Sequence, residues 1–535
     1  MTASAHRDSF VRDNLPPAAE WPVLQFDRPE LQFPPRLNAA MELVDRAITE
    51  GDGDRVAILS SGLRWTYRDL QDRVDRIARV LVDQCGLVPG NRVLLRGANS
   101  PMQAAAWLAV WKAGGVAVGT MPLLRAKELG EMIRIARVSH AICDAALAAD
   151  LEVARTTHPE LRELVLHGEG GNLEQRMAQY PGEFAPVDTA ADDPALIAFT
   201  SGTTGIPKGT VHFHRDVMAM CEVFPRHCLK PGRDDVFIGT PPLAFTFGLG
   251  GLLCFPLRAR AATVLVEKLT PDLLLTAIQL YHATICFTSP TAYRQMTPMA
   301  SASDLHSLRK CVSAGEALPQ ATRDQWREAT RLQIYDGIGG TEMLHIYLGS
   351  SPEDYRPGAL GKLLPGYIGM VVDDELRPLP PGEVGRLALR GPTGCRYLAD
   401  PRQRDYVRNG WNLPGDAFHV DEDGYFYYHS RVDDMIVTSG YNVAAPEVEW
   451  ALLGHPAVAE CGVVGVPDAD RGQLVAAFVV LKPGFSADDE MTKALQEFAK
   501  RTIAPYKYPR VVRFLEALPR TETGKLQRFK LKTLV

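Results

Sequence analysis

The sequence lacks three features that would assign it to a class at once: an excess of basic charge, a long apolar run and paired cysteines. Its 58 Lys and Arg face 64 Asp and Glu, so the net charge of −6 gives no basic footprint for nucleic acid or an anionic membrane. The most apolar stretch, FGLGGLLCFPLRARAATVLV, is broken by Pro256, Arg258 and Arg260, and we expect neither a membrane span nor a targeting segment. The nine cysteines include no C-x-x-C pair, which argues against a disulfide framework and a zinc site and fits a reducing cytoplasm. We therefore expect small-molecule chemistry in the cytoplasm.

The pattern of elements predicts more than one domain. At 535 residues the chain is too long for a single core, and 46% apolar residues argue against disorder. From about residue 92 short β-rich runs alternate with amphipathic helices, and the rhythm returns after about residue 235, which is typical of parallel sheets covered by helices. Short strands between roughly 380 and 430 indicate a β-rich subdomain. We predict an α/β fold with a large N-terminal domain, 1–432, of stacked βα layers plus that subdomain, and a small α+β C-terminal domain, 433–535.

The stretch TSGTTGIPKGT (200–210) is a candidate phosphate-binding loop of an uncommon kind. It follows the apolar run ALIAF, at the carboxyl end of an expected buried strand, where open α/β sheets bind ligands. Its glycines let the backbone approach an anion, its hydroxyls can donate, and Lys208 adds positive charge. Pro207 and Gly209 occupy positions that a Walker loop reserves for Gly and Ser/Thr, which disfavours an ordinary P-loop NTPase. The alternative is a flexible Ser/Thr/Gly turn.

Four further strings follow in the order expected of one family. They are YDGIGGTEM (335–343), WNLPGDAF (411–418), YHSRVDDMIVTSGYNVAAPEVE (428–449) and LPRTETGKLQR (518–528). Taken singly, they read as a helix cap, a turn, a charge cluster and an exposed lysine. Together with TSGTTGIPKGT they resemble the adenylate-forming enzymes, which include acyl-CoA synthetases, luciferases and peptide-synthetase adenylation domains. One departure is Pro414, which replaces the usual Thr before Gly-Asp.

The resemblance implies roles for individual residues. Nucleotide contacts are expected from Thr200, Ser201, Gly202, Thr203, Thr204, Lys208, Asp336, Thr341, Asp416 and Arg431. Catalysis is expected from Lys525, Thr341 and Glu342, with Glu342 also a ligand of magnesium bound with ATP. Lys525 would bridge the attacking carboxylate and the α-phosphate, both of which are anionic. Asp433 would be the hinge of a mobile C-terminal domain, and the coenzyme A contacts would be Gly440, Arg471 and Lys507.

The expected acid pocket favours a flat ring. The strings AFTFGLGG, SAGEALP and DGIGGTEMLHIY resemble the benzoate-CoA ligase group, and the wider chain looks most like 2-aminobenzoate-CoA ligases. The pocket residues implied are Thr246, Phe247, Leu249, Gly315, Gly337, Ile338, Gly340 and His345. Glycines leave a narrow slot beside Phe247, and Thr246 or His345 could meet an ortho amino group as a neutral partner. His345 reads equally well as a core histidine.

The sequence therefore predicts an ATP-dependent aryl acid-CoA ligase with ATP, Mg²⁺ and coenzyme A as cofactors and a small aromatic carboxylate as substrate. A homodimer is possible; neither nucleic acid nor a membrane is expected as a partner. Three alternatives stay open: an adenylating enzyme that loads a carrier protein, a ligase for another substituted benzoate, and a nucleotide-binding protein without turnover.

Overall fold

The computed structural model describes residues 2–200, 206–438, 441–468, 471–520 and 526–534. The chain divides into two compact units, which are described separately. The first unit comprises Met1–Leu318, Thr322–Gly369 and Leu389–Pro414; the second comprises Pro319–Ala321, Met370–Ala388 and Gly415–Val535. The domain boundary expected between residues 432 and 433 stays a prediction.

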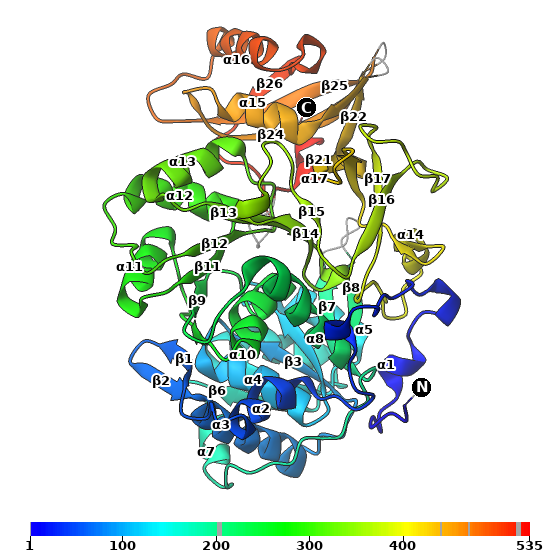
Figure 1. Cartoon of the computed structure of the whole chain (residues 1–535), viewed down its shortest axis with the longest axis vertical. Coiled ribbons are helices and arrows are strands. Elements are labelled where there is room, and N and C mark those ends of the chain that lie inside the picture. The colour runs from blue at the N-terminus through cyan, green and yellow to red at the C-terminus, as the bar shows by residue number, and fades with distance from the viewer. Residues whose placement is uncertain (1, 201–205, 439–440, 469–470, 521–525, 535) are drawn as a thin grey trace. The chain divides into compact units, whose positions relative to one another are not determined.

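A six-stranded sheet forms one layer of the first unit (Figure 1). Its order is β6-β5-β3-β4-β7-β8, and all neighbours are parallel except β7 and β8. Every residue of β3 and β4 is buried, as expected for parallel strands covered on both faces. The strands are β3 (Arg92–Arg96), β4 (Val116–Thr120), β5 (His140–Asp144), β6 (Glu163–His167), β7 (Pro194–Thr200) and β8 (Lys208–Phe213). The main helices nearby in sequence are α3 (Tyr67–Arg79), α4 (Pro101–Lys112), α5 (Ala126–Ala136), α6 (Ala148–Thr157) and α8 (His214–Phe224).

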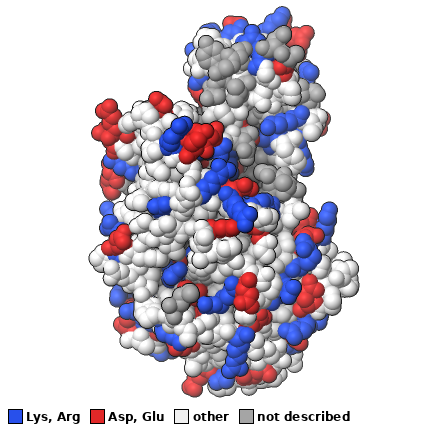
Figure 2. All heavy atoms as spheres, turned by 90° about the vertical axis from the view of Figure 1, so that its right-hand side faces the viewer, with Lys and Arg blue, Asp and Glu red and all other residues white. Residues whose placement is uncertain are grey.

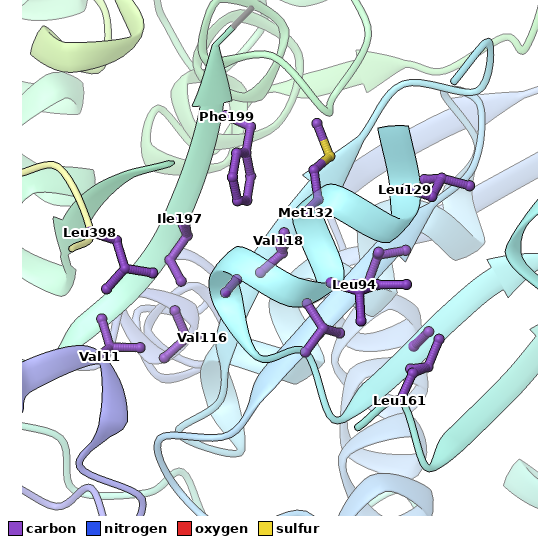
Figure 3. Close-up of a cluster of buried hydrophobic side chains, with 14 of the residues drawn as sticks. Val11, Leu94, Val116, Val118, Leu129, Met132, Leu161, Ile197, Phe199 and Leu398 are labelled. Atoms are coloured by element: carbon purple, nitrogen blue, oxygen red, sulfur yellow. The ribbon is translucent and has the colours of Figure 1, made fainter. Parts of the chain in front are cut away.

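A hydrophobic cluster between α5 and this sheet fixes the end of β7. Ile197 and Phe199 of β7 pack in this cluster with Met132 of α5 and with Leu398 (Figure 3). Alternate residues of a strand share a face, so Thr200 projects to the face opposite Phe199. Burial of these apolar side chains thus holds the point where the TSGTTGIPKGT segment begins.

A nine-stranded sheet forms the second layer of the first unit. Its order is β15-β14-β13-β12-β11-β9-β10-β1-β2, parallel from β13 to β1 and antiparallel at both edges. The strands are β1 (Val56–Ser60), β2 (Leu63–Thr66), β9 (Val236–Gly239), β10 (Ala262–Val264), β11 (Ile285–Thr288), β12 (Lys310–Ser313), β13 (Ile334–Gly339), β14 (Ile346–Ser350) and β15 (Lys362–Leu363). Helices α11 (Pro271–Tyr281), α12 (Pro290–Ala300) and α13 (Gln320–Thr330) run beside β9 to β13 (Figure 1). Their apolar faces form one core, in which Tyr293 and Trp326 meet edge to face at 4.9 Å.

The stretch expected to be β-rich contains short antiparallel strands. In the first unit β18 (Val407–Arg408) pairs with β19 (Trp411–Asn412). In the second unit β20 (Asp416–Val420) pairs with β21 (Phe426–Arg431), and Gly385 and Arg386 of β17 (Gly385–Arg390) pair with β20. Strand β16 (Ile368–Val372) pairs with β17.

The rest of the second unit is an α+β fold. Its sheet runs β23-β22-β25-β24, and β26 joins β25 in parallel. The elements are β22 (Met435–Thr438), β23 (Tyr441–Ala444), α15 (Ala445–Leu453), β24 (Val458–Asp468), β25 (Gly472–Leu481), α16 (Asp489–Thr502), β26 (Val511–Phe514) and α17 (Arg528–Leu531). Apolar residues of α15 and α16, such as Val448 and Leu495, pack on the sheet around Val463. The predicted α/β class, with a large N-terminal part and a smaller α+β part, is confirmed.

The surface is mixed in charge. Figure 2 shows basic and acidic side chains interspersed on one face of the molecule. Among the described residues, no helix is both long and apolar enough to span a bilayer. All nine cysteines are free and buried.

Candidate functional site

Strands β7 and β8 bring the two ends of the TSGTTGIPKGT segment together. Thr200, the last residue of β7, lies opposite Lys208, the first residue of β8. The Thr200 hydroxyl is buried and has no hydrogen-bond partner among the described residues, which is rare unless a further group completes it. The Lys208 ammonium lies 4.6 Å from the centroid of the Tyr397 ring. Four predicted nucleotide contacts, Ser201, Gly202, Thr203 and Thr204, lie outside the described residues.

Thr341 and Glu342 lie in a single 3-10 turn, η8 (Thr341–Met343), just after β13. The Tyr397 hydroxyl donates to Glu342 Oε1 at 2.6 Å. Burial, and then the Glu342 carboxylate, raise the pKa of Tyr397, so its hydroxyl keeps the proton that it donates. The Thr341 carbonyl accepts a hydrogen bond of 2.7 Å from His212 Nε2. One Glu342 oxygen is therefore oriented by the protein, and the residue is only half-buried.

Asp336 lies deeper than its predicted role suggests. It is buried on β13, and its carboxylate pairs with Arg323 at 3.0 Å. Burial raises the pKa of Asp336 to about 6, although Arg323 and the Gly337 backbone amide act in the opposite direction. Arg323 also donates to the Ile334 carbonyl at 2.8 Å, which ties α13 to β13. The structure thus gives Asp336 a clear structural partner, and its contact with nucleotide stays a prediction.

The candidate acid pocket contains a histidine within an aromatic cage. The His345 ring lies 4.5 Å from Phe255, 5.8 Å from Phe247 and 6.0 Å from Phe224, measured between ring centroids. Burial lowers the pKa of His345 to about 3, with the Phe247 backbone acting in the opposite direction, so the imidazole is neutral at pH 7. Neither ring nitrogen has a hydrogen-bond partner of good geometry among the described residues. A Cβ at Gly250 would lie 2.7 Å from His345 Nε2, so only glycine leaves room for this ring.

The other predicted pocket residues come from the ends of two strands and from one short helix. Thr246, Phe247 and Leu249 form α9 (Thr246–Leu249), which follows β9. Gly337 and Ile338 belong to β13, and Gly340 precedes η8. Ser313 of β12 pairs with Asp336, so Gly315 follows β12 at the level where β13 ends. Gly315 has φ +90°, a left-handed conformation that favours glycine, and a Cβ there would meet open space.

In the second unit Asp416 and Arg431 form an ion pair. They face each other across β20 and β21, and Arg431 Nη1 lies 3.1 Å from Asp416 Oδ1. The Asp416 side chain is 7% exposed and that of Arg431 48% exposed. The arginine can therefore reach an anion while it holds the buried carboxylate. Two residues predicted to act on one ribose and its phosphates are thus neighbours.

The remaining predicted residues of the second unit are only partly described. Asp433 lies in the 3-10 turn η10 (Val432–Asp434), while Gly440 and Lys525 lie outside the described residues. Lys507 is bound to Glu447, with its ammonium 2.6 Å from the carboxylate. Arg471 is exposed, and its backbone amide donates to Asp468 at 2.9 Å. Their contacts with coenzyme A stay predictions.

Two residues that hydrogen-bond to η8, His212 and Tyr397, were not predicted from the sequence. Tyr397 and His212 are 55 and 129 residues away from the groups that they contact, and no local motif links them. The one signal in the sequence is that His212 stands between two apolar residues, Val211 and Phe213, of β8. A cavity of about 700 Å³ lies elsewhere, and none of the predicted site residues lines it. Within its lining, Lys112 pairs with both Asp45 and Asp75.

Comparisons with known proteins cover nearly the whole chain. A family model described as AMP-binding enzyme matches residues 45–397, and one described as AMP-binding enzyme C-terminal domain matches residues 447–525. A benzoate-CoA ligase of Thauera aromatica is 35% identical over 516 residues, which are 94% of this chain and 97% of the relative.

Two solved structures are similar along their full length. One is the anthranilate CoA ligase AuaEII in complex with anthranoyl-AMP, with a TM-score of 0.89 and 32% identity, covering 95% of this chain and 99% of that chain. The other is a benzoate CoA ligase from Burkholderia xenovorans LB400, with a TM-score of 0.85 and 31% identity, covering 92% of this chain and 99% of that chain.

Proposed function

The chain belongs to the AMP-binding enzyme family, and on that premise we propose that it is an aryl acid-CoA ligase for 2-aminobenzoate or benzoate. It joins the acid to coenzyme A at the expense of ATP, which leaves as AMP and pyrophosphate. Nine free, buried thiols suit a reducing cytoplasm, where we place the reaction.

The observation that supports an aryl acid most directly is that His345 is neutral, lies among three phenyl rings and has no hydrogen-bond partner of good geometry in the part of the chain that the structure describes. Aromatic walls favour a flat ring over a flexible chain. A buried imidazole without a partner accepts a hydrogen bond at little cost, because its desolvation has already taken place on folding. An ortho amino group is such a donor and is uncharged at pH 7. The same pocket accepts benzoate but gives the His345 nitrogen no donor, so this hydrogen bond would favour 2-aminobenzoate between the two candidate acids.

The nucleotide phosphates are assigned to Thr200, Lys208, Thr341 and Glu342 of the first unit. The Thr200 hydroxyl, which has no partner within the described ranges, and the ammonium of Lys208 supply donor groups at the ends of one loop. The described residues contain no group of three or more His, Cys, Asp or Glu side chains that could hold a metal ion. A single carboxylate, Glu342, suits magnesium, which binds through one or two carboxylates together with substrate phosphates. When bound, magnesium would neutralise charge on those phosphates.

The first half-reaction joins the acid to the α-phosphorus of ATP. A carboxylate oxygen attacks that phosphorus, the bond to the bridging oxygen breaks, and pyrophosphate leaves with the electron pair. We assign Lys525 to this step, in which its positive charge would bridge the two anions and stabilise the charge that develops on the phosphoryl oxygens. In the second half-reaction the coenzyme A sulfur attacks the acyl carbon, and AMP leaves.

The second unit contributes the ribose and coenzyme A contacts in this account. The buried Asp416 carboxylate accepts from the ribose hydroxyls, and Arg431, which orients it, faces ribose or phosphate. We assign the backbone rotation between the half-reactions to Asp433 and the passage of the pantetheine arm to Gly440. Arg471 and Lys507 are assigned to the coenzyme A phosphates; Lys507 would do so while paired with Glu447.

One substrate panel tests the proposal. We expect AMP release with coenzyme A to be fastest, as kcat/KM, with 2-aminobenzoate or benzoate in a panel that adds 2-hydroxybenzoate, 4-hydroxybenzoate and hexanoate. Best turnover on hexanoate would refute the aryl pocket. Adenylate formation without consumption of coenzyme A, together with transfer to a carrier protein, would favour the carrier-loading alternative. Absence of turnover with intact ATP binding would indicate a protein that binds nucleotide without chemistry.

A further inference from the structure

A fully buried cluster of polar side chains contacts η8 through the Thr341 carbonyl. Its members are His212 of β8, Asp216 of α8 and Arg396 of the segment 389–414, and each is 0% exposed. Burying an ionised or polar side chain is costly unless its partners are in place, so an apolar core would be the simpler solution at this position. We therefore expect the cluster to have a role in positioning a neighbouring part of the chain.

His212 connects the cluster to the site. Its Nε2 lies 2.7 Å from the Thr341 carbonyl oxygen, and because a carbonyl only accepts, Nε2 must bear the proton. Its Nδ1 lies 3.8 Å from Asp216 Oδ2, too far for a hydrogen bond. The ring is thus oriented by one directional contact, and that contact is to the backbone of η8.

Asp216 and Arg396 hold the strand from which His212 projects. Burial alone would raise the pKa of Asp216, but the Arg396 guanidinium holds it below its usual value, so the carboxylate is ionised. Asp216 pairs with Arg396 and accepts from the Phe213 backbone amide at 3.0 Å. The Val211 amide donates to the Arg396 carbonyl at 2.8 Å. The residues on either side of His212 are thereby fixed.

The turn η8 is held at three points. The Thr341 carbonyl accepts a hydrogen bond from His212. Glu342 Oε1 accepts one from the Tyr397 hydroxyl at 2.6 Å. The Met343 carbonyl accepts one from Thr393 Oγ1 at 2.7 Å. The segment that contains Tyr397 is joined to β8, the strand that contains His212. Tyr397 forms an isolated β-bridge with Thr210, and the Leu398 amide donates to the Gly209 carbonyl at 2.8 Å. The orientation of Thr341 and Glu342 is therefore set from β8 and the segment 389–414 together.

We propose that His212 is a positioning residue for the adenylation step, which acts by holding the Thr341 carbonyl so that the Thr341 hydroxyl and the Glu342 carboxylate keep their places. This inference rests on the proposed function, because it assumes that Thr341 and Glu342 serve the nucleotide. It assigns His212 to the first half-reaction only. A preformed aryl-adenylate no longer needs the geometry for attack on the α-phosphate.

The test compares His212→Leu, His212→Gln and a matched control, His214→Leu. His214 lies two residues away, is equally buried, and accepts from the Ala39 amide at 3.2 Å, far from η8 in the hydrogen-bond network. We expect His212→Leu to lower the kcat of aryl-acid-dependent pyrophosphate release by about tenfold to a hundredfold, as for small displacements of reacting groups. Thioester formation from synthetic aryl-adenylate should stay within about threefold of the unmutated rate, because the binding pocket is intact. His212→Gln should recover most of the loss, since its amide can donate from nearly the position of Nε2.

Two readouts separate this inference from a folding defect and from the proposed function. Calorimetric binding of a non-hydrolysable ATP analogue with Mg²⁺ should weaken in His212→Leu but not in His214→Leu, although both give the same circular dichroism spectrum. Equal losses in the two leucine variants, equal losses in the two half-reactions, or no rescue by glutamine would overturn the role of His212. If the unmutated protein binds the analogue but adenylates no aryl acid, the proposed function fails, while a His212-specific loss of analogue binding would still support the positioning of η8.

Discussion

Replacing His345 with leucine tests whether the acid pocket recognises an ortho amino group through a hydrogen bond to His345. Leucine is close to histidine in size and fills the cage formed by Phe224, Phe247 and Phe255, but it cannot accept a hydrogen bond. A neutral hydrogen bond contributes about 0.5 to 1.5 kcal/mol, so the preference for 2-aminobenzoate over benzoate in kcat/KM should fall about 2- to 13-fold. Activity on benzoate should change little, because benzoate leaves the nitrogen unpaired.

The same substitution has a second, pH-dependent effect. The folded pKa of His345 is about 3, below the unfolded value of 6.5, so the unfolded chain binds the proton first as the pH falls. The stability present above pH 6.5 is lost progressively between pH 6.5 and about pH 3. From pH 7 to pH 5 this single group costs the unmutated protein about 2 kcal/mol. His345→Leu lacks that loss, so its stability relative to the unmutated protein should rise by this amount over the same interval.

The assay combines urea unfolding at pH 7 and pH 5, followed by tryptophan fluorescence, with kcat/KM for the two acids. His214→Leu is the control, because burial also lowers the pKa of His214 to about 3. That variant should show a similar gain on acidification but unchanged acid selectivity. The reasoning is refuted if His345→Leu keeps the full preference for 2-aminobenzoate, or if its stability relative to the unmutated protein does not change between pH 7 and pH 5.

Three further substitutions test the assignments outside this pocket. Asp433→Pro fixes φ near −65° and removes a backbone donor, so adenylate formation should survive while thioester formation falls steeply; equal loss of both would point to misfolding or a misassigned hinge. Lys525→Ala should lower acid-dependent pyrophosphate release by about 100- to 1,000-fold. The same variant should form thioester from synthetic aryl-adenylate at close to the unmutated rate. Failure in both steps would contradict the assignment of Lys525 to adenylation alone. Asp416→Asn should raise the KM for ATP about tenfold or more, as expected for loss of a charged acceptor, without changing the KM for the acid; an unchanged KM for ATP would remove Asp416 from the ribose contact.

The sequence predicts elements whose signal is local. Alternating β-rich runs and amphipathic helices indicate parallel layers, and RVLLR and VAVGT are strands buried at every residue. The pairing of Asp416 with Arg431 was not predicted, although the two residues lie on β20 and β21, which are neighbours in the sequence and pair as antiparallel strands. Local patterns therefore predict the strands at whose ends several candidate site residues lie.

Contacts between distant segments could not be predicted in the same way. Nothing near Glu342 indicates that Tyr397 donates to it, and the partner of Thr341 lies 129 residues away. Asp336 reads as a nucleotide contact from its motif, yet Arg323 binds its carboxylate because α13 packs beside β13. The cage around His345 joins residues of three helical segments that share no motif. Such contacts depend on tertiary packing, which a pattern of neighbouring residues does not encode.

The central claim is that a carboxylate oxygen of an aryl acid attacks the α-phosphorus of ATP before coenzyme A takes the acyl group. It is tested by turnover of 2-aminobenzoate labelled with ¹⁸O at both carboxyl oxygens, followed by mass spectrometry of every product. We expect one ¹⁸O in each AMP, one in the thioester carbonyl and none in pyrophosphate. Label in inorganic phosphate with ADP as the nucleotide product, or AMP free of label, would contradict the account.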